Sequence, residues 1–177
     1  MPIVFLDESG YSLRAIPGKT WSPIGQPPVL REFYCRDNQS GIGFLSVSPK
    51  VSRLSFHFSM VSGAINSEDM IFFLTQLHHY YSKRVMVIMD RLAAHRTAAE
   101  WFIQIHSKWF CIEYLPAYCP ELNPVEHCWQ WMKNVKLANV VASNTFELCQ
   151  NVFHAADCLN TNIPLLRSFF KLSNLRL

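Results

Sequence analysis

Two short apolar segments of this chain each end in an aspartate, and this feature limits the possible folds more than any other. Residues 3–6 run directly into Asp7, and residues 85–89 run directly into Asp90. Continuous apolar runs of this length are typical of strands that are buried on both faces of a sheet. Aspartate is disfavoured in strands, and a charge beside a core costs several kcal/mol unless it is paired or binds a metal. If the two strands are neighbours, we expect both carboxylates to meet at one edge of the sheet.

The segments that follow the first strand change their periodicity along the chain. Residues 11–37 are crowded with proline and glycine, which predicts an extended loop arm. Strands are expected at 41–48 and 52–60, and an amphipathic helix is expected to begin at Asn66–Ser67. The core face of this helix combines four apolar residues at helical spacing: Met70, Phe73, Leu74 and Leu77.

Helices and strands alternate in the second half of the chain. A capping box at Thr97–Glu100 predicts the start of a helix, and a strand is expected at 110–115. Asn123–Pro124 combines a favoured N-cap residue with proline at the first helical position, and two further helices are expected at 144–158 and 163–172. The predicted core residues are Ala98, Trp101, Phe102 and Ile105 in the first of these helices, and Val125, Cys128, Trp129, Met132 and Val135 in the second.

This order of elements predicts an α/β chain with an RNase H-like fold. Such a fold has a mixed central sheet, an antiparallel meander followed by alternating helices and strands, flanked by helices. We expect one domain of this kind at residues 1–140, with the loop arm at 11–37 inserted after its first strand. Residues 141–177 are expected to form a C-terminal helical extension of the same domain, because no linker is long enough to separate a second one.

A third carboxylate, Glu126, is predicted in the first turn of the helix that begins after Asn123. Three oxygen ligands that converge in this way suit Mg²⁺ or Mn²⁺, and two such ions about 4 Å apart would activate a water or a 3′-hydroxyl for attack on a phosphodiester. Each carboxylate also has a purely structural interpretation. Asp7 could begin a turn, Asp90 could cap a loop, and Glu126 could complete a capping box. Glu126 lies at the edge of the apolar stripe, so it could cap the helix and still project at a rim.

Composition excludes several classes of protein. Half of the 177 residues are hydrophobic and only 16% are charged, so the chain can fill a core and is not disordered. The longest apolar runs have five residues, whereas a membrane span needs about 20, and the N-terminus has no secretory signal. We therefore expect a cytoplasmic protein with no membrane partner. The net charge of +3 lies wholly in residues 128–177, where it could face phosphates or only solvent.

Three sequence blocks carry a resemblance to a known family. They are Phe5-Leu-Asp-Glu-Ser-Gly-Tyr11, Val87-Ile-Met-Asp-Arg-Leu-Ala-Ala-His95 and Tyr118-Cys-Pro-Glu-Leu-Asn-Pro-Val-Glu-His-Cys-Trp129, the last followed by Lys133. Together with Thr20-Trp-Ser-Pro-Ile-Gly-Gln-Pro-Pro-Val29, they resemble the DDE transposases of the mariner superfamily, and more specifically its bacterial insertion sequences. The resemblance covers about residues 3–136, and its last block is the most specific.

The resemblance implies Mg²⁺- or Mn²⁺-dependent DNA strand cleavage and strand transfer at transposon ends, carried out by a homodimer with an RNase H-like fold. Carried over by position, Asp7, Asp90 and Glu126 become the catalytic, metal-binding triad. We expect the protein to associate with the bacterial nucleoid in the cytoplasm. The first strand begins too early to leave room for a helix-turn-helix module, so a separate or frameshift-joined N-terminal half would read the transposon ends.

Other residues in or near these blocks have more than one possible role. Lys133 could contact a phosphate or be solvated, and Trp21 in the arm is a candidate contact with DNA or a second subunit. His95 could position DNA or an aspartate, or pack as an ordinary loop histidine. Arg91 stands where the family usually has asparagine, and its guanidinium could occupy the Asp90 carboxylate. Two alternatives stay open: an inactive remnant that binds DNA or dimerises without catalysis, and an RNase H-type nuclease.

Overall fold

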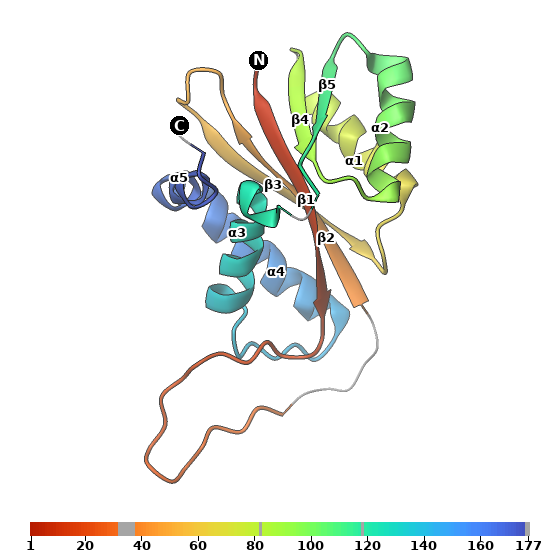
Figure 1. Cartoon of the computed structure of the whole chain (residues 1–177). Coiled ribbons are helices and arrows are strands. Elements are labelled where there is room, and N and C mark those ends of the chain that lie inside the picture. Colours follow the sequence, from red (N-terminus) through yellow and green to blue (C-terminus); the bar gives the residue numbers. More distant parts are fainter. Residues whose placement is uncertain (32–37, 82, 118, 176–177) are drawn as a thin grey trace.

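One mixed sheet forms the centre of the protein. The structure is a computed structural model, and it describes residues 1–31, 38–81, 83–117 and 119–175. Its five strands lie in the order β3-β2-β1-β4-β5 (Figure 1). The first three strands pair in antiparallel fashion, whereas β1, β4 and β5 are parallel, as the order of elements predicts. The strands are β1 (Ile3–Ser12), β2 (Asn38–Val47), β3 (Leu54–Ser62), β4 (Val85–Met89) and β5 (Phe110–Tyr114).

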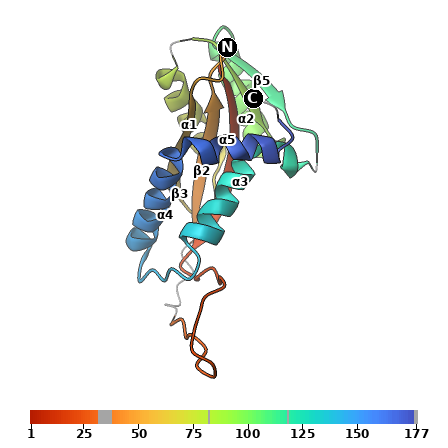
Figure 2. The ribbon, with the colours of Figure 1, turned by 90° about the vertical axis from the view of Figure 1, so that its left-hand side faces the viewer.

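Helices cover both faces of this sheet (Figures 1 and 2). Side chains alternate along β1, so that Val4 and Leu6 join the core under α1 and α2, while Phe5 joins the core under α3, α4 and α5. No helix in the described part of the chain is long and apolar enough to cross a membrane. The helices are α1 (Ser67–Tyr80), α2 (Ala93–His106), α3 (Pro124–Trp131), α4 (Thr145–Asn160) and α5 (Ile163–Leu172).

Two helix starts follow the predictions closely. Asn66 caps α1, and its side chain and that of Asp69 form a complete capping box. Asn123 caps α3, its side chain accepts from the Val125 amide, and Pro124 occupies the first turn. The four predicted core residues of α1 are all buried: Met70, Phe73, Leu74 and Leu77. Local capping chemistry was therefore sufficient to locate both helices.

The first strand is longer than predicted. Asp7 does not end β1, which continues to Ser12 because antiparallel pairing with β2 extends over its whole length. Only the pairing with β4 stops early, at Phe5 with Ile88. The predicted end of the strand at Asp7 was therefore wrong on the side of β1 that pairs with β2. The hydrogen bonds to β2 extend the strand, and the apolar pattern does not reveal them.

The predicted start of α2 was wrong, and its predicted inner face was correct for Ala98 and Phe102 but wrong for Trp101 and Ile105. The helix begins at Ala93 rather than near Thr97, and Trp101 and Ile105 are 42% and 55% exposed. This helix carries apolar residues on two faces, so periodicity alone does not choose between them. Packing against the sheet selects one of them, and the buried residues are His95, Ala98, Ala99 and Phe102.

The predicted core stripe of α3 fails at its last member. Met132–Lys136 forms a π-helical turn, closed by a hydrogen bond of 2.9 Å from the Leu137 amide to the Met132 carbonyl. The wider turn shifts the phase of the helix, so Val135 is 61% exposed and Leu137 is buried instead. Val125, Cys128, Trp129 and Met132 are buried as predicted.

The predicted loop arm extends away from the body of the molecule (Figures 1 and 2). Its base is fixed by a bridge between Ile16 and Ala138, and by hydrogen bonds of 2.9 and 3.1 Å between Gly18 and the Asn139 side chain. Trp21 is 99% exposed. The end of the predicted arm, residues 32–37, and Tyr118 of the third sequence block lie outside the described residues.

Candidate active site

β1 and β4 carry Asp7 and Asp90 to neighbouring positions. The parallel register pairs Phe5 with Ile88, and the two aspartates lie two residues further along adjacent chains. Neighbouring strands lie about 4.8 Å apart. Glu126 comes from the first turn of α3, and all three carboxylates line one cavity of about 440 Å³. The structure therefore brings the three predicted carboxylates together from three separate elements.

Asp7 is a partly buried carboxylate near two other carboxylates. Its Oδ2 accepts a hydrogen bond of 3.1 Å from the indole nitrogen of Trp129. Burial, and next the charge of Glu126, raise the pKa of Asp7 to about 7. At neutral pH the protonated and ionised forms of Asp7 are therefore both populated, and a nearby cation would favour the ionised form.

Gly43 allows Trp129 to reach Asp7. β2 places Gly43 opposite Asp7, and a Cβ at this position would lie 2.6 Å from the Trp129 ring. Trp129 also packs against Phe56 and Phe58, with ring centroids 5.5 and 5.9 Å away. The sequence predicts Trp129 only as a core residue, and the structure adds a hydrogen bond to the site. Glu126 lies three residues earlier in the same helix, and this spacing was the available signal.

Asp90 is held in a different way. Its Oδ1 accepts hydrogen bonds from the Leu92 amide, at 3.0 Å, and from Nδ1 of His95. The other ring nitrogen of His95 lies 2.8 Å from Oε1 of Glu8. Burial would raise the pKa of Asp90, but the hydrogen bonds from His95 and Leu92 outweigh it and keep the pKa below its usual value.

His95 is a buried cation between two carboxylates. Its side chain has no exposed surface, and burial alone would lower its pKa. Hydrogen bonds to Asp90 and Glu8 outweigh burial and raise the pKa of His95 to about 9. His95 lies in the first turn of α2 rather than in a loop, and its burial excludes the direct DNA contact that the sequence left open. Of the predicted roles, positioning an aspartate fits this placement.

Glu8 is a site residue that sequence reasoning missed. It follows Asp7 in β1, so strand alternation directs it to the opposite face of the sheet, toward α2. Its carboxylate is only 22% exposed and meets His95 there. The signal was available in the alternation of β1, because a charge on a covered face needs a partner, but the identity of that partner depends on the position of α2.

Glu126 does not complete a capping box. The Asn123 amide donates to the Pro120 carbonyl at 2.9 Å, so it is not available to the Glu126 side chain. The Asn123 side chain itself caps the helix through the Val125 amide, at 3.2 Å. The capping-box interpretation of Glu126 was therefore wrong, and its carboxylate lines the cavity.

Two cationic side chains lie beside the carboxylates. The Arg91 guanidinium rests over the Tyr114 ring, 5.7 Å from its centroid, rather than on Asp90. Lys133 extends over the Tyr11 ring at 5.2 Å. Burial lowers the pKa of Lys133, and the charges of Glu126 and Asp7 act in the opposite direction, which places this amine within their electrostatic reach.

The carboxylates share a cavity without forming a closed set of metal ligands. In the part of the chain that the structure describes, no group of three or more His, Cys, Asp and Glu side chains is arranged to hold a metal ion. Asp90 is engaged by His95, and its charge raises the pKa of Asp7 less than that of Glu126 does. Of the two neighbouring carboxylates, Glu126 therefore has the stronger electrostatic influence on Asp7.

The mixed sheet flanked by helices has the RNase H-like fold, and three carboxylates line one of its cavities. Residues 2–149 match the family described as DDE superfamily endonuclease. The chain belongs to this family, and the resemblance seen in its three sequence blocks is confirmed. No curated protein sequence matches the chain.

Solved structures of the Mos1 mariner transposase have the same fold. Its paired end complex with Mg is 17% identical, with a TM-score of 0.65 over 97% of this chain and 52% of that chain. The paired end complex with Mn is 18% identical, with a TM-score of 0.62 over 97% and 52%. The strand transfer complex is 17% identical, with a TM-score of 0.62 over 97% and 51%. The present chain therefore spans about half the length of these transposase chains.

Proposed function

We propose that this chain is a transposase catalytic domain that cleaves DNA strands at transposon ends and joins them to target DNA. The observation that carries the proposal is the convergence of Asp7, Asp90 and Glu126 on one cavity within the DDE endonuclease family. The matched Mos1 structures are a paired end complex and a strand transfer complex, which supports a DNA substrate for this chain as well. A DNA substrate would bring the protein to the bacterial nucleoid.

The donor set fits a hard divalent cation. Three carboxylates supply only oxygen ligands, and the burial and the neighbouring charge of Glu126 that raise the pKa of Asp7 would both favour a bound cation. Asp7, Asp90 and Glu126 would hold one or two Mg²⁺ or Mn²⁺ ions, which, when bound, polarise the phosphodiester and activate the attacking water or 3′-hydroxyl.

The remaining side chains prepare the site for that substrate. The indole of Trp129 orients Asp7, and the imidazolium of His95 keeps Asp90 ionised and fixed. Lys133 lies close enough to the carboxylates to attract the phosphate backbone of a strand that enters the cavity.

The exposed arm offers a second kind of contact. Trp21 is 99% exposed on a segment whose base is fixed at Ile16 and Gly18. We propose that it contacts DNA or the second subunit of a homodimer. A separate or frameshift-joined helix-turn-helix half would supply the recognition of transposon ends.

An inactive remnant is the second candidate. It is favoured by the engagement of one oxygen of Asp90 with His95, and by the lack, within the described residues, of a group of three His, Cys, Asp or Glu side chains that could hold a metal ion. Arg91 does not add to this argument, because its guanidinium lies over Tyr114.

The substitution Glu126→Gln separates these candidates. The amide keeps the size of the side chain but loses the anionic oxygen that binds a cation. We expect metal-free melting close to wild type and a loss of Mn²⁺-dependent nicking of plasmid DNA by at least about 100-fold. In parallel, Mn²⁺ should raise the melting temperature of wild type and not that of Asp90→Ala.

Glu147→Gln is the matched control, since Glu147 also follows an N-cap asparagine but lies in α4, outside the acidic cavity. Nicking of equal rate in wild type and Glu126→Gln would remove Glu126 from the catalytic set. A wild-type protein that neither nicks DNA nor responds to Mn²⁺ would be the inactive remnant.

A further inference from the structure

A histidine and a cysteine lie one turn apart in the second half of α4, outside the acidic cavity. Sγ of Cys158 is 3.7 Å from Nε2 of His154. His154 is exposed and Cys158 is half-buried, so the pair lies at the protein surface. Neither residue lines the acidic cavity, and neither has a role in the proposed function. The pair is therefore a separate group of chemically active side chains.

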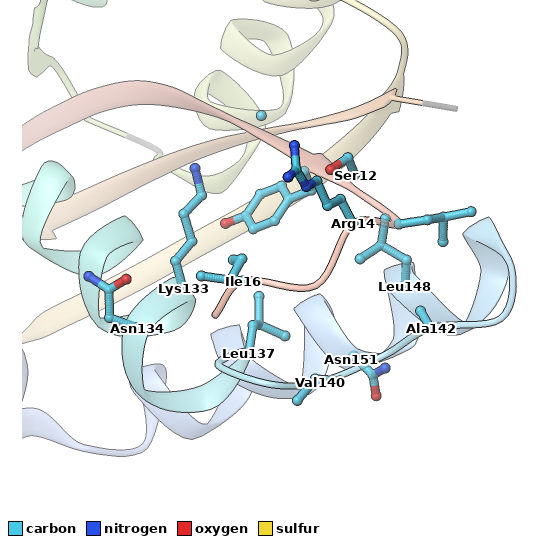
Figure 3. Close-up of a pocket in the computed structure, with 13 residues that line it drawn as sticks. Ser12, Arg14, Ile16, Lys133, Asn134, Leu137, Val140, Ala142, Leu148 and Asn151 are labelled. Carbon is cyan, nitrogen blue, oxygen red and sulfur yellow. The ribbon is translucent and has the colours of Figure 1, made fainter. Parts of the chain in front are cut away.

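The pair lies on the flank of α4 that faces the π-helical turn. Figure 3 shows Asn151 of α4 beside a cavity of about 200 Å³, which Lys133 of the π-helical turn also lines. His154 and Cys158 follow Asn151 by three and seven residues, and this spacing keeps side chains on one face of a helix. Neither of them lines this cavity, so the pair lies further along α4, toward its C-terminal end.

The distance between the two donor atoms suits a shared metal ion. Tetrahedral Zn²⁺ has Zn–S bonds of about 2.3 Å and Zn–N bonds of about 2.0–2.1 Å, which place sulfur and nitrogen ligands about 3.5 Å apart. The separation of 3.7 Å between Cys158 and His154 differs from this value by about 0.2 Å, which is within the tolerance of a plausible metal site. The pair can therefore bind one ion with almost no movement of either side chain.

The two donors select a different class of metal from the acidic cavity. Thiolate and imidazole ligands favour Zn²⁺, whereas sites built only from oxygen favour Mg²⁺ and Mn²⁺. A nitrogen and sulfur site also binds Zn²⁺ more tightly than Mn²⁺. The chain thus carries two sets of donors that do not compete for the same ion.

The electrostatics at the C-terminal end of α4 favour a cation. A helix C-terminus carries a partial negative charge, and the last turn of α4 has no basic residue to offset it. Asp157 adds a negative charge next to Cys158 in the chain, and it has no ion-pair partner among the described residues. This observation is independent of the distance between the two donor atoms, and it also indicates a positively charged ligand.

The other described cysteines lack this arrangement. Cys149 belongs to the same helix and is also half-buried, but no histidine precedes or follows it by three or four residues. Cys128 is buried and adjoins His127 in sequence, and direct neighbours point to different sides of a helix. Within the described residues, Cys158 is thus the only cysteine at hydrogen-bond distance from a histidine.

We propose that His154 and Cys158 bind a Zn²⁺ ion on α4, at a site separate from the acidic cavity. The thiol proton of Cys158 would pass to solvent as the bond from Sγ to zinc forms, Nε2 of His154 would bind in its neutral form, and water would fill the remaining positions. The ion would join two successive turns of α4 and stabilise its C-terminal half. This half includes Asn160, whose side chain accepts a hydrogen bond of 3.0 Å from the Phe56 amide of β3.

The test uses the reduced full chain without DNA, and Co²⁺ as a coloured substitute for Zn²⁺. A thiolate bound to Co²⁺ gives a charge-transfer absorption band in the near ultraviolet, which carboxylate ligands do not give. We expect Co²⁺ to produce this band, Zn²⁺ to remove it by displacing Co²⁺, and excess Mg²⁺ to leave it unchanged. Because the band requires a cysteine ligand, the result does not depend on whether the acidic cavity is an active site.

Variants of α4 identify the ligands. Cys158→Ser should abolish the charge-transfer band. His154→Ala, at an exposed position, should weaken Zn²⁺ binding by at least about tenfold, measured by competition with a chromophoric chelator in excess Mg²⁺. Even residues that only support a metal ligand change metal affinity by about 10- to 100-fold when they are replaced.

Cys149→Ser is the matched control, because the same exchange in the same helix removes a thiol that has no histidine partner. Its charge-transfer band and Zn²⁺ affinity should equal those of wild type. A band that survives in Cys158→Ser would overturn the proposal, as would Zn²⁺ binding that is unchanged in His154→Ala. The absence of the band in wild type would overturn it as well, whatever the outcome of the nicking experiments.

Discussion

The two aspartates on neighbouring strands illustrate opposite ways to keep a carboxylate in a protein. Asp7 faces α3, accepts hydrogen bonds from the neutral indole of Trp129 and from the backbone of Glu8, and lies near a second carboxylate. Asp90 faces α2 and is held by a backbone amide and the buried cation of His95. Their pKa values move apart as a result, to about 7 for Asp7 and below the usual value for Asp90.

The two aspartates differ in whether the fold supplies a hydrogen-bonded cationic partner. The α2 side supplies its own positive charge, so Asp90 is ionised and ordered without help. On the α3 side, burial and the charge of Glu126 raise the pKa of Asp7, and the Lys133 amine lies within electrostatic reach of both carboxylates. The charge of Asp7 can be offset further by a proton or by a bound ion. Variants that alter one side only should therefore have opposite effects on stability.

The largest effect is expected from Asp7→Asn. A pKa raised from 3.8 to about 7 corresponds to a cost of roughly 4 kcal/mol for the ionised form. This cost is absent below pH 3.8 and complete above pH 7, because the folded protein holds the proton more tightly than the unfolded chain. Asparagine keeps an acceptor for Trp129, so metal-free urea unfolding at pH 8 should show a gain of up to about 4 kcal/mol.

The same variant should lose Mn²⁺-dependent nicking by at least about 100-fold, because a metal ligand is removed. Denaturation at pH 4 is the internal control, since the difference from wild type should nearly vanish there. A loss of stability at pH 8 would contradict the view of Asp7 as an uncompensated charge.

The opposite result is expected on the α2 side, from His95→Gln. Removing the buried cation leaves Glu8 and Asp90 facing each other, and breaking such a pair costs about 3 kcal/mol when it is fully buried. Asp90 is 42% exposed, so solvent screening reduces the expected loss to roughly 2 kcal/mol.

The loss in His95→Gln should depend on pH in the direction set by its raised pKa. Stability from His95 is fully present below pH 6.5 and is lost as the pH rises through about 9. Urea unfolding of wild type and variant should therefore differ most at pH 6 and converge near pH 10. A difference that grows with pH would show that His95 is neutral in the folded protein.

Much of the scaffold was predictable because its signals are local. The capping residue Asn66, the pair Asn123–Pro124 and the apolar run of β4 each locate an element without knowledge of its partners. The three carboxylates were predicted for the same reason, since two of them follow apolar runs and the third follows a helix cap.

Most of the unpredicted parts depend on contacts between distant segments. The extension of β1 to Ser12 requires β2, and the inner face of α2 is chosen by packing between two apolar faces. The bond between His95 and Glu8 joins residues 87 positions apart. The π-helical turn leaves no mark in a pattern read with a period of 3.6 residues, and it displaced Val135 from the predicted core.

A third prediction concerns the pH dependence of metal binding. Because Asp7 must lose a proton to bind Mg²⁺ or Mn²⁺, affinity should fall by about tenfold for each pH unit below 7. Isothermal titration in two buffers of different ionisation enthalpy should show nearly one proton released per binding event at pH 6 and almost none at pH 8.5. Glu147→Gln, outside the cavity, should behave like wild type. Equal proton release at both pH values would indicate that Asp7 is not a ligand.

The smallest effect is expected from Arg91→Asn, which introduces the residue that the family usually has at this position. The Arg91 guanidinium lies over the Tyr114 ring, 5.7 Å from its centroid. Oδ1 of Asp90 instead accepts hydrogen bonds from His95 and the Leu92 amide. An exposed cation–π contact contributes only about 0.5–1 kcal/mol, so stability should fall by no more than this amount.

Nicking by Arg91→Asn should stay within about threefold of wild type, since about 0.6 kcal/mol changes a rate by that factor at most. Tyr114→Leu is the matched test, because it frees the guanidinium without removing its charge. If Arg91 then turns to Asp90, Mn²⁺ affinity should fall in Tyr114→Leu and recover in the double variant with Arg91→Asn. A rise of tenfold or more in the nicking rate of Arg91→Asn alone would show instead that Arg91 already competes for Asp90, and that the α2 side carries two cations rather than one.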